Sequence, residues 1–97
     1  MTSLAAMQRE SRPALAPQVR FRNDPVSGEP VLLYPEGVLV LNATAADIVK
    51  RCDGKISINQ LVAQMSHEYE TDETTLAADV VECLADLSKR TLLVFLP

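Results

Sequence analysis

Residues 31–54, VLLYPEGVLVLNATAADIVKRCDG, decide the fold, because the spacing of their apolar side chains changes partway along the stretch. Two short apolar runs, 31–34 and 38–41, flank the Pro-Glu-Gly segment at 35–37, a combination that favours a tight turn. After residue 41 the apolar side chains recur every three to four positions, which is the period of an amphipathic helix. The stretch therefore predicts two strands joined by a turn and followed by a helix.

A further strand precedes this hairpin. Val19, Arg20, Phe21 and Arg22 alternate apolar and charged side chains, as expected for a strand with one buried face. Residues 23–29 contain proline and glycine and predict a reversal before the second strand. The second and third strands are apolar at every position, which is typical of strands covered on both faces.

Three helices are expected after the sheet. The first begins near Asn42 or Thr44 and ends near Gly54, which we expect to supply a left-handed helix cap. The second covers about residues 57–69 and opens with a capping box, and the third runs from residue 71 or 72 to about 90. These elements predict an α+β, winged-helix-like fold: a three-stranded antiparallel sheet followed by three helices.

The third helix is more apolar than a small core requires. At about 100° per residue, its apolar side chains cover an arc of roughly 220°, about twice the width typical of a surface helix. The arc contains Leu76, Ala77, Ala78, Val80, Val81, Cys83, Leu84, Ala85, Leu87 and Leu92. Two interpretations remain open: the sheet and the first two helices fill the whole arc, or part of it receives a second apolar partner.

The two ends of the chain are less regular. Residues 1–16 have no sustained period and predict a flexible N-terminal tail, so the folded domain is expected to span residues 17–97. The apolar run at 92–96, LLVFL, is compatible with a closing strand, a further core segment, or a tail that pairs with another copy.

Composition argues against several classes of function. A net charge of −4 opposes binding to nucleic acid, and the third helix carries five acidic residues and no basic one between positions 72 and 88. One histidine and two cysteines are too few for a zinc site, so we expect no metal. No set of catalytic or phosphate-binding residues can be assembled, so we expect no enzyme activity and no cofactor.

The chain is expected to be cytoplasmic. No apolar run reaches the roughly 18 residues of a membrane-spanning helix. The first twelve residues include Gln8, Arg9 and Glu10, which are unlike the apolar centre of a secretory signal. We therefore expect a single soluble domain with no membrane contact.

Several motifs occur in an order typical of one known family. Pro13 and Pro17 precede Arg-Phe-Arg at 20–22, and VLLYPEG at 31–37 is followed by LNATA at 41–45 and CDG at 52–54. From residue 13 to about 95 this ordered set resembles the PqqD family of peptide chaperones in pyrroloquinoline quinone biosynthesis, also called RiPP recognition elements. Thr91 departs from the pattern, because many members of the family have glycine there.

The resemblance implies a winged-helix-like domain that binds the leader region of the precursor peptide PqqA and presents it to the radical-SAM enzyme PqqE. In similar modules the peptide adds as an extra strand beside the third strand and packs against the third helix. Carried onto this sequence, the expected peptide-binding residues are Val38, Leu39, Val40, Leu41, Ala77, Val80, Val81, Leu84 and Ser88. The alternative is a self-associating scaffold without peptide affinity, and the sequence is compatible with either a monomer or a homodimer.

Overall fold

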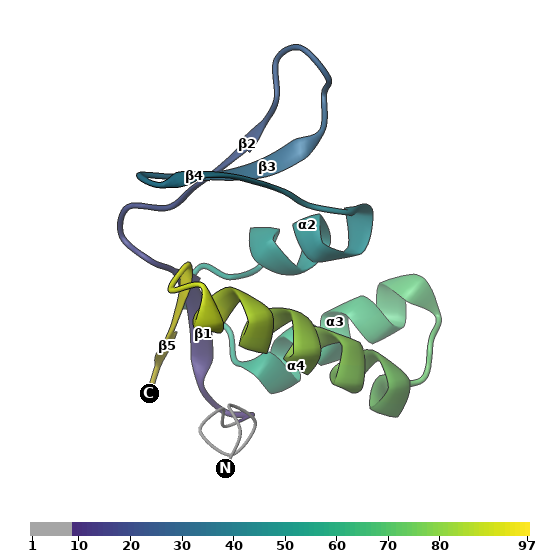
Figure 1. Cartoon of the computed structure of the whole chain (residues 1–97). Helices are drawn as coiled ribbons and strands as arrows, with labels where there is room; N and C mark the ends of the chain where they lie inside the picture. The colour runs from purple at the N-terminus through teal and green to yellow at the C-terminus, as the bar shows by residue number, and fades with distance from the viewer. Residues whose placement is uncertain (1–8) are drawn as a thin grey trace.

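The structure of the protein, a computed structural model, describes residues 9–97. Its elements in chain order are β1 (Arg12–Leu15), β2 (Arg20–Asn23), β3 (Pro30–Tyr34), β4 (Gly37–Val40), α2 (Ala43–Lys50), α3 (Ile58–Tyr69), α4 (Glu73–Lys89) and β5 (Leu93–Leu96). Strands β2, β3 and β4 form an antiparallel sheet in that order. The predicted three-stranded sheet followed by three helices is therefore confirmed, and Figure 1 shows α2 between the sheet and the pair formed by α3 and α4.

The inner face of the sheet packs on α2. Phe21, Leu32 and Leu39 lie opposite one another on the three strands and so share this face. Leu32 is fully buried, and Lys50 of α2 lies over the Phe21 ring at 5.7 Å from its centroid. The strand-to-helix order of residues 31–50 thus places α2 directly beneath the strands that precede it.

Most of the outer face of the sheet is open, although Val31 on this face is buried. Val38 and Val40 of β4 are 58% and 56% exposed, and Leu33 of β3 is 37% exposed. The expectation that both faces of these strands are covered is therefore wrong for the described structure. The uninterrupted apolar pattern reflects a face that remains open to solvent or to a partner.

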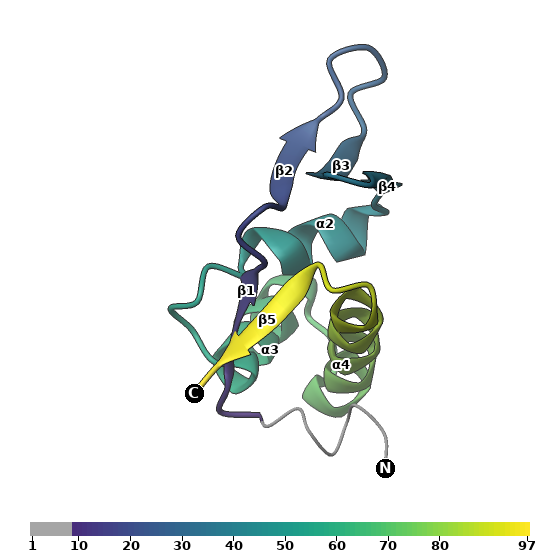
Figure 2. The ribbon, with the colours of Figure 1, turned by 60° about the vertical axis from the view of Figure 1, so that its left-hand side comes forward.

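The N-terminal segment is more ordered than the sequence suggests. Arg12–Leu15, assigned to the flexible tail, form β1 and pair antiparallel with β5, as Figure 2 shows. Two main-chain bonds also tie residues 9–11 to the start of α3, from the N–H of Asn59 to the carbonyl of Arg9 and from that of Ile58 to Ser11. The tail prediction is thus corrected for residues 9–15, and its residues 1–8 lie outside the described part of the chain.

The first two helices begin as their sequences predict. Asn42 caps α2 by accepting a bond from the Ala45 N–H at 2.7 Å, and Ser57 and Gln60 form a reciprocal capping box on α3. Gly54, however, does not cap α2, which ends at Lys50 with Arg51 as its C-cap. It has a φ of 78° in the following loop, and a Cβ there would lie 3.0 Å from Leu96, so Gly54 permits close packing beneath β5.

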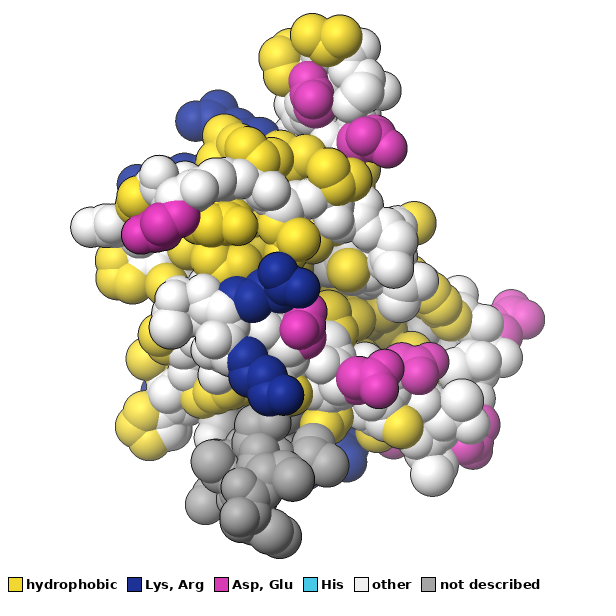
Figure 3. Space-filling view, in the orientation of Figure 1, with side chains coloured by type: hydrophobic (Ala, Val, Ile, Leu, Met, Phe, Trp, Pro, Cys, Tyr) yellow, Lys and Arg dark blue, Asp and Glu magenta, His cyan; other side chains and the backbone are white. Residues whose placement is uncertain are grey.

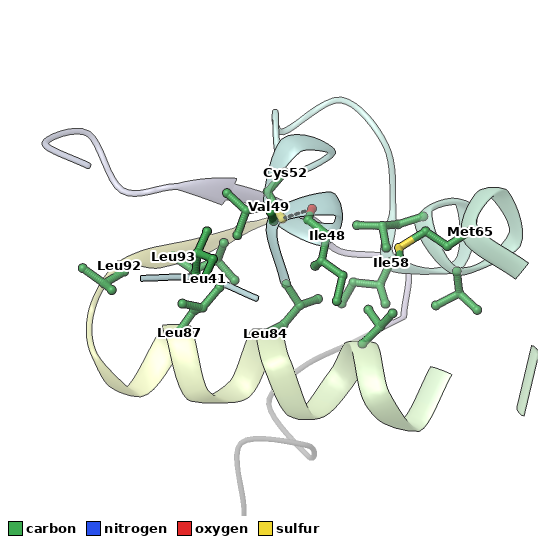
Figure 4. Packing of buried hydrophobic residues seen from close by; sticks show 14 of the residues in the cluster. Leu41, Ile48, Val49, Cys52, Ile58, Met65, Leu84, Leu87, Leu92 and Leu93 are labelled. Atoms are coloured by element: carbon green, nitrogen blue, oxygen red, sulfur yellow. Dashed lines mark hydrogen bonds between the residues drawn. The ribbon is translucent and has the colours of Figure 1, made fainter. Parts of the chain in front are cut away.

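Most of the apolar arc of α4 is used by the core. Leu76, Ala77, Val80, Leu84 and Leu87 are buried, the last two against residues of the preceding elements and of β5. Figure 4 shows Leu84 and Leu87 directed from α4 toward Leu41 and Ile48. The interpretation in which the fold itself fills the arc is therefore correct for the centre of the helix face, and only its two flanks remain partly exposed.

The backbone at the end of α4 shows why glycine would suit position 91, where this sequence has threonine. The N–H of Leu92 donates to the carbonyl of Leu87 at 3.0 Å, and the N–H of Thr91 donates to that of Ser88 at 2.9 Å. This is a Schellman motif, which requires a left-handed residue after the cap, and Thr91 has a φ of 59°. Glycine adopts that conformation without strain, whereas a β-branched threonine does not. Of the three options for residues 92–96, the closing strand is the one observed.

Candidate functional site

The site begins at the edge of the three-stranded sheet. Strand β4 pairs with β3 on one side, and no other strand within residues 9–97 pairs with its second side. An unpaired edge presents a row of backbone N–H and C=O groups that can pair with another extended chain. Edges of this kind bind peptides by strand addition.

The register identifies the backbone groups that face outward. The N–H of Leu41 donates to the carbonyl of Pro30 at 2.9 Å, so the next hydrogen-bonded pair along the ladder is Leu39 with Leu32. Residues alternate between bonded and non-bonded positions in an antiparallel pair. The N–H and C=O groups of Val38 and Val40 therefore point away from β3 and are available at the open edge.

A groove lies where β4 leads into α2. Its walls come from the start of α2 and from one flank of α4, and its volume is about 600 Å³. The lining residues are Asn42, Thr44, Ala45, Ile48, Asp79, Glu82, Cys83 and Asp86. Asn42 follows the last residue of β4 by only two positions, so the groove is adjacent to the open edge. We call it the α2–α4 groove.

The α2–α4 groove has a mixed chemical character. Ala45 and Cys83 contribute partly exposed apolar surface, Ile48 is buried at the base, and three carboxylates of α4 line the opposite wall. One of them, Asp86, pairs with Arg90 at 3.2 Å. Burial, together with the nearby Asp86, raises the pKa of the Cys83 thiol to about 11, so this group is neutral at physiological pH. The groove therefore combines small, uncharged groups with an acidic rim.

The predicted site residues separate into three groups. Val38 and Val40 lie at the open edge. Leu39 is on the face of the sheet that packs on α2, and Leu41 is buried. Val80 and Leu84 are 0% exposed and Ala77 is buried, so these three belong to the core and their assignment to a surface groove is corrected. Val81 and Ser88 are half-buried.

Val81 faces away from the α2–α4 groove. At about 100° per residue, Val81 and Cys83 lie roughly 160° apart around the helix, so they occupy opposite flanks of α4. Val81 instead lines a separate depression with Arg9, Thr74 and Ala78. The structure therefore does not bring Val81 together with the β4 edge.

Sequence reasoning missed the contribution of α2. The sequence predicts Thr44 as a possible helix cap and Ala45 as part of the buried helix face, yet both line the α2–α4 groove. Their short side chains leave the space that a longer residue would fill. The available signal was the placement of small residues immediately after an exposed strand, a position that borders any edge-bound peptide.

Two other kinds of site are absent from the described residues. Within residues 9–97, no group of three histidine, cysteine or acidic side chains is placed to hold a metal ion. None of the helices in this part of the chain has the length and apolarity needed to cross a membrane. The open β4 edge and the α2–α4 groove are therefore the candidate functional site.

Comparison with known proteins identifies relatives over most of the chain. The profile of the family described as coenzyme PQQ synthesis protein D (PqqD) matches residues 29–93. A PqqA binding protein of Xanthomonas oryzae pv. oryzae (strain KACC10331 / KXO85) is 34% identical over 90 residues, which cover 93% of this chain and 98% of the relative. A PqqA binding protein of Rhodopseudomonas palustris (strain BisB5) is 35% identical over 80 residues, covering 82% and 78%.

A solved structure has the same fold. It is the solution NMR structure of the PqqD truncation of Methylobacterium extorquens PqqCD, described as a functional and stand-alone RiPP recognition element. The two chains superpose with a TM-score of 0.78 at 30% sequence identity, over 91% of this chain and 94% of the other.

Proposed function

Because this chain belongs to the PqqD family of coenzyme PQQ synthesis proteins, we propose that it is a non-catalytic module that binds the precursor peptide PqqA by strand addition to β4. The observation that carries the proposal is the open β4 edge beside the α2–α4 groove. The relatives described as PqqA binding proteins support the choice of peptide.

The geometry supports a division of roles between backbone and side chains. The outward N–H and C=O groups of Val38 and Val40 can bond any extended peptide, because backbone pairing does not depend on sequence. Alternate side chains of the added strand then point toward the α2–α4 groove. The groove therefore selects the peptide, and the edge supplies much of the affinity.

We extend the proposal to delivery of the peptide. A strand bound at the β4 edge lies at the protein surface, with one of its own edges still unpaired. A second protein can therefore reach the bound peptide without displacing it. This arrangement suits a module that presents PqqA to the radical-SAM enzyme PqqE.

Two single variants, each with one alanine replaced by glutamate, test the proposed site. Ala45→Glu places a long acidic side chain in the α2–α4 groove, whereas Ala78→Glu places the same side chain on the opposite flank of α4. Both variants change the net charge equally. Titration calorimetry with the synthetic leader region of PqqA should show at least a tenfold weaker affinity, about 1.4 kcal/mol, for Ala45→Glu alone.

Two controls complete the experiment. Circular dichroism should show unchanged helix content in both variants, and amide shifts of Val38 and Val40 should move on adding peptide to the native protein. Equal affinity of Ala45→Glu and the native protein, or shifts confined to the Val81 flank, would refute the proposed site.

Self-association remains a second candidate, and a specific observation favours it. An exposed apolar edge strand can pair with the same strand of another copy, which would form a dimer through β4. Light scattering with increasing peptide distinguishes the two roles. A dimer that dissociates as PqqA binds indicates competition for one edge, whereas a dimer with no peptide affinity indicates a scaffold.

A further inference from the structure

The outer face of the sheet has a regular chemical pattern. The register places its side chains in two cross-strand rows, each running from β2 through β3 to β4. One row is Arg20, Leu33 and Val38, and the other is Arg22, Val31 and Val40. Each row thus begins with an arginine and ends with a valine at the open edge. We call these six residues the outer sheet face.

Most of the apolar part of the outer sheet face is exposed. Val31 is the exception, because it is only 4% exposed. Leu33, Val38 and Val40 are among the most exposed large apolar side chains of residues 9–97. Apolar residues gathered on a surface in this way mark interaction sites more often than they stabilise a fold.

The charge of the outer sheet face is opposite to that of the chain. The full sequence has a net charge of −4, but strands β2, β3 and β4 contain two arginines and no acidic residue. Figure 3 shows basic side chains beside hydrophobic ones on the sheet, and acidic side chains both at the turns that join the strands and along α4. A local reversal of charge favours a partner of complementary sign.

The two arginines differ in their freedom to bind. Arg20 donates to the carbonyls of Pro17 and Val19 at 2.9 and 3.2 Å, which holds its guanidinium against the chain. Arg22 has no ion-pair partner among the described residues. Its guanidinium is therefore the group best placed to bind a carboxylate of another protein.

We propose that the outer sheet face docks a protein partner whose surface carries carboxylates around an apolar centre, and that a bound peptide strand completes this surface. The second part rests on the proposed function. The occupant follows from the pattern itself: the exposed Leu33, Val38 and Val40 match an apolar patch, and Arg22 matches an acidic rim.

The dimensions indicate that a bound peptide would strengthen docking. Three strands of four or five residues cover about 14 Å by about 17 Å. A stable interface buries about 800 Å² on each partner, which is more than such a face provides. A strand added to β4 widens the face by about a third and places alternate peptide side chains beside Val38 and Val40. The partner would then bind the loaded module more tightly than the empty one.

The experiment measures binding of purified PqqE to the full-length protein, with and without the PqqA leader. Arg22→Glu reverses a charge on the outer sheet face, two strands away from the peptide edge, and Lys55→Glu reverses an exposed charge in the loop after α2. Interferometry should show at least a tenfold loss of PqqE binding for Arg22→Glu. Lys55→Glu should lie within about twofold of the native protein.

Peptide affinity of the same variants separates this inference from the proposed function. Both variants should bind the PqqA leader as the native protein does. Equal binding of PqqE by the two variants overturns the docking surface, even if the peptide binds. Absence of peptide binding in the native protein overturns the proposed function instead, and the peptide-free titration still tests the outer sheet face.

Discussion

Replacement of Val40 by proline tests strand addition by removing one backbone N–H group. Proline lacks the backbone N–H, and the N–H of Val40 points away from β3 toward the open edge. The ladder between β3 and β4 therefore loses no hydrogen bond, and proline is tolerated on edge strands when the missing N–H faces outward. The substitution removes a donor that only an added strand would use.

The expected loss of affinity follows from that one bond. A backbone hydrogen bond contributes about 0.5–1.5 kcal/mol net, which corresponds to a loss of roughly twofold to tenfold in peptide affinity. The pyrrolidine ring also projects into the space next to the edge, so we expect a value at the upper end. Titration calorimetry with the PqqA leader measures this change, and thermal unfolding checks that the sheet is retained.

Two matched variants define the result that refutes the reasoning. Val40→Ala keeps the N–H and should bind the peptide within about twofold of the native protein. Leu39→Pro removes an N–H that bonds to β3 and should destabilise the sheet. If Val40→Pro is folded and binds PqqA with native affinity, the peptide does not pair with β4.

Two further predictions concern stability. Thr91→Gly should raise the free energy of unfolding by about 1 kcal/mol, because glycine adopts the left-handed conformation at the end of α4 without strain. Denaturant unfolding measures this gain. A loss of stability would contradict the assigned strain. Burial raises the pKa of the Cys52 thiol from 9.0 to about 12, and that of Cys83 to about 11. As the pH rises, the two thiols therefore lose their protons in the unfolded chain at a lower pH than in the folded chain. Their contribution to the free energy of unfolding should be constant below about pH 9 and should fall as the pH rises toward 11. A Cys52→Ala, Cys83→Ala double variant should show a shallower fall, and an equal fall would contradict the assignment.

Local signals predicted the elements well. The turn residues at 35–37, the cap at Asn42 and the capping box at Ser57 act over a few residues, and each lies where the sequence places it. Such features depend on neighbouring residues and are therefore visible in the sequence. An open edge on the third strand was implied by the resemblance to the PqqD family, in which the peptide adds beside that strand.

Long-range pairing was not predictable in the same way. Arg12–Leu15 carry no strand period, and they become ordered only because β5, some eighty residues later, pairs with them. The two flanks of α4 posed the same difficulty. Val81 and Cys83 are both apolar in the sequence, and only the packing of α2 shows that Cys83 borders the groove.

The pairing of β1 with β5 also determines how this domain can be connected to other proteins. The Arg12 side chain donates to the carbonyl of Pro97 at 2.7 Å, so the start and the finish of the folded region meet at one pole. Figure 1 places this pole on the far side of α2 from the β2–β3 hairpin. A fusion partner attached after Pro97 would start at that pole and leave β4 unobstructed. The open edge of β4 and the ends of the described chain thus lie on different sides of α2.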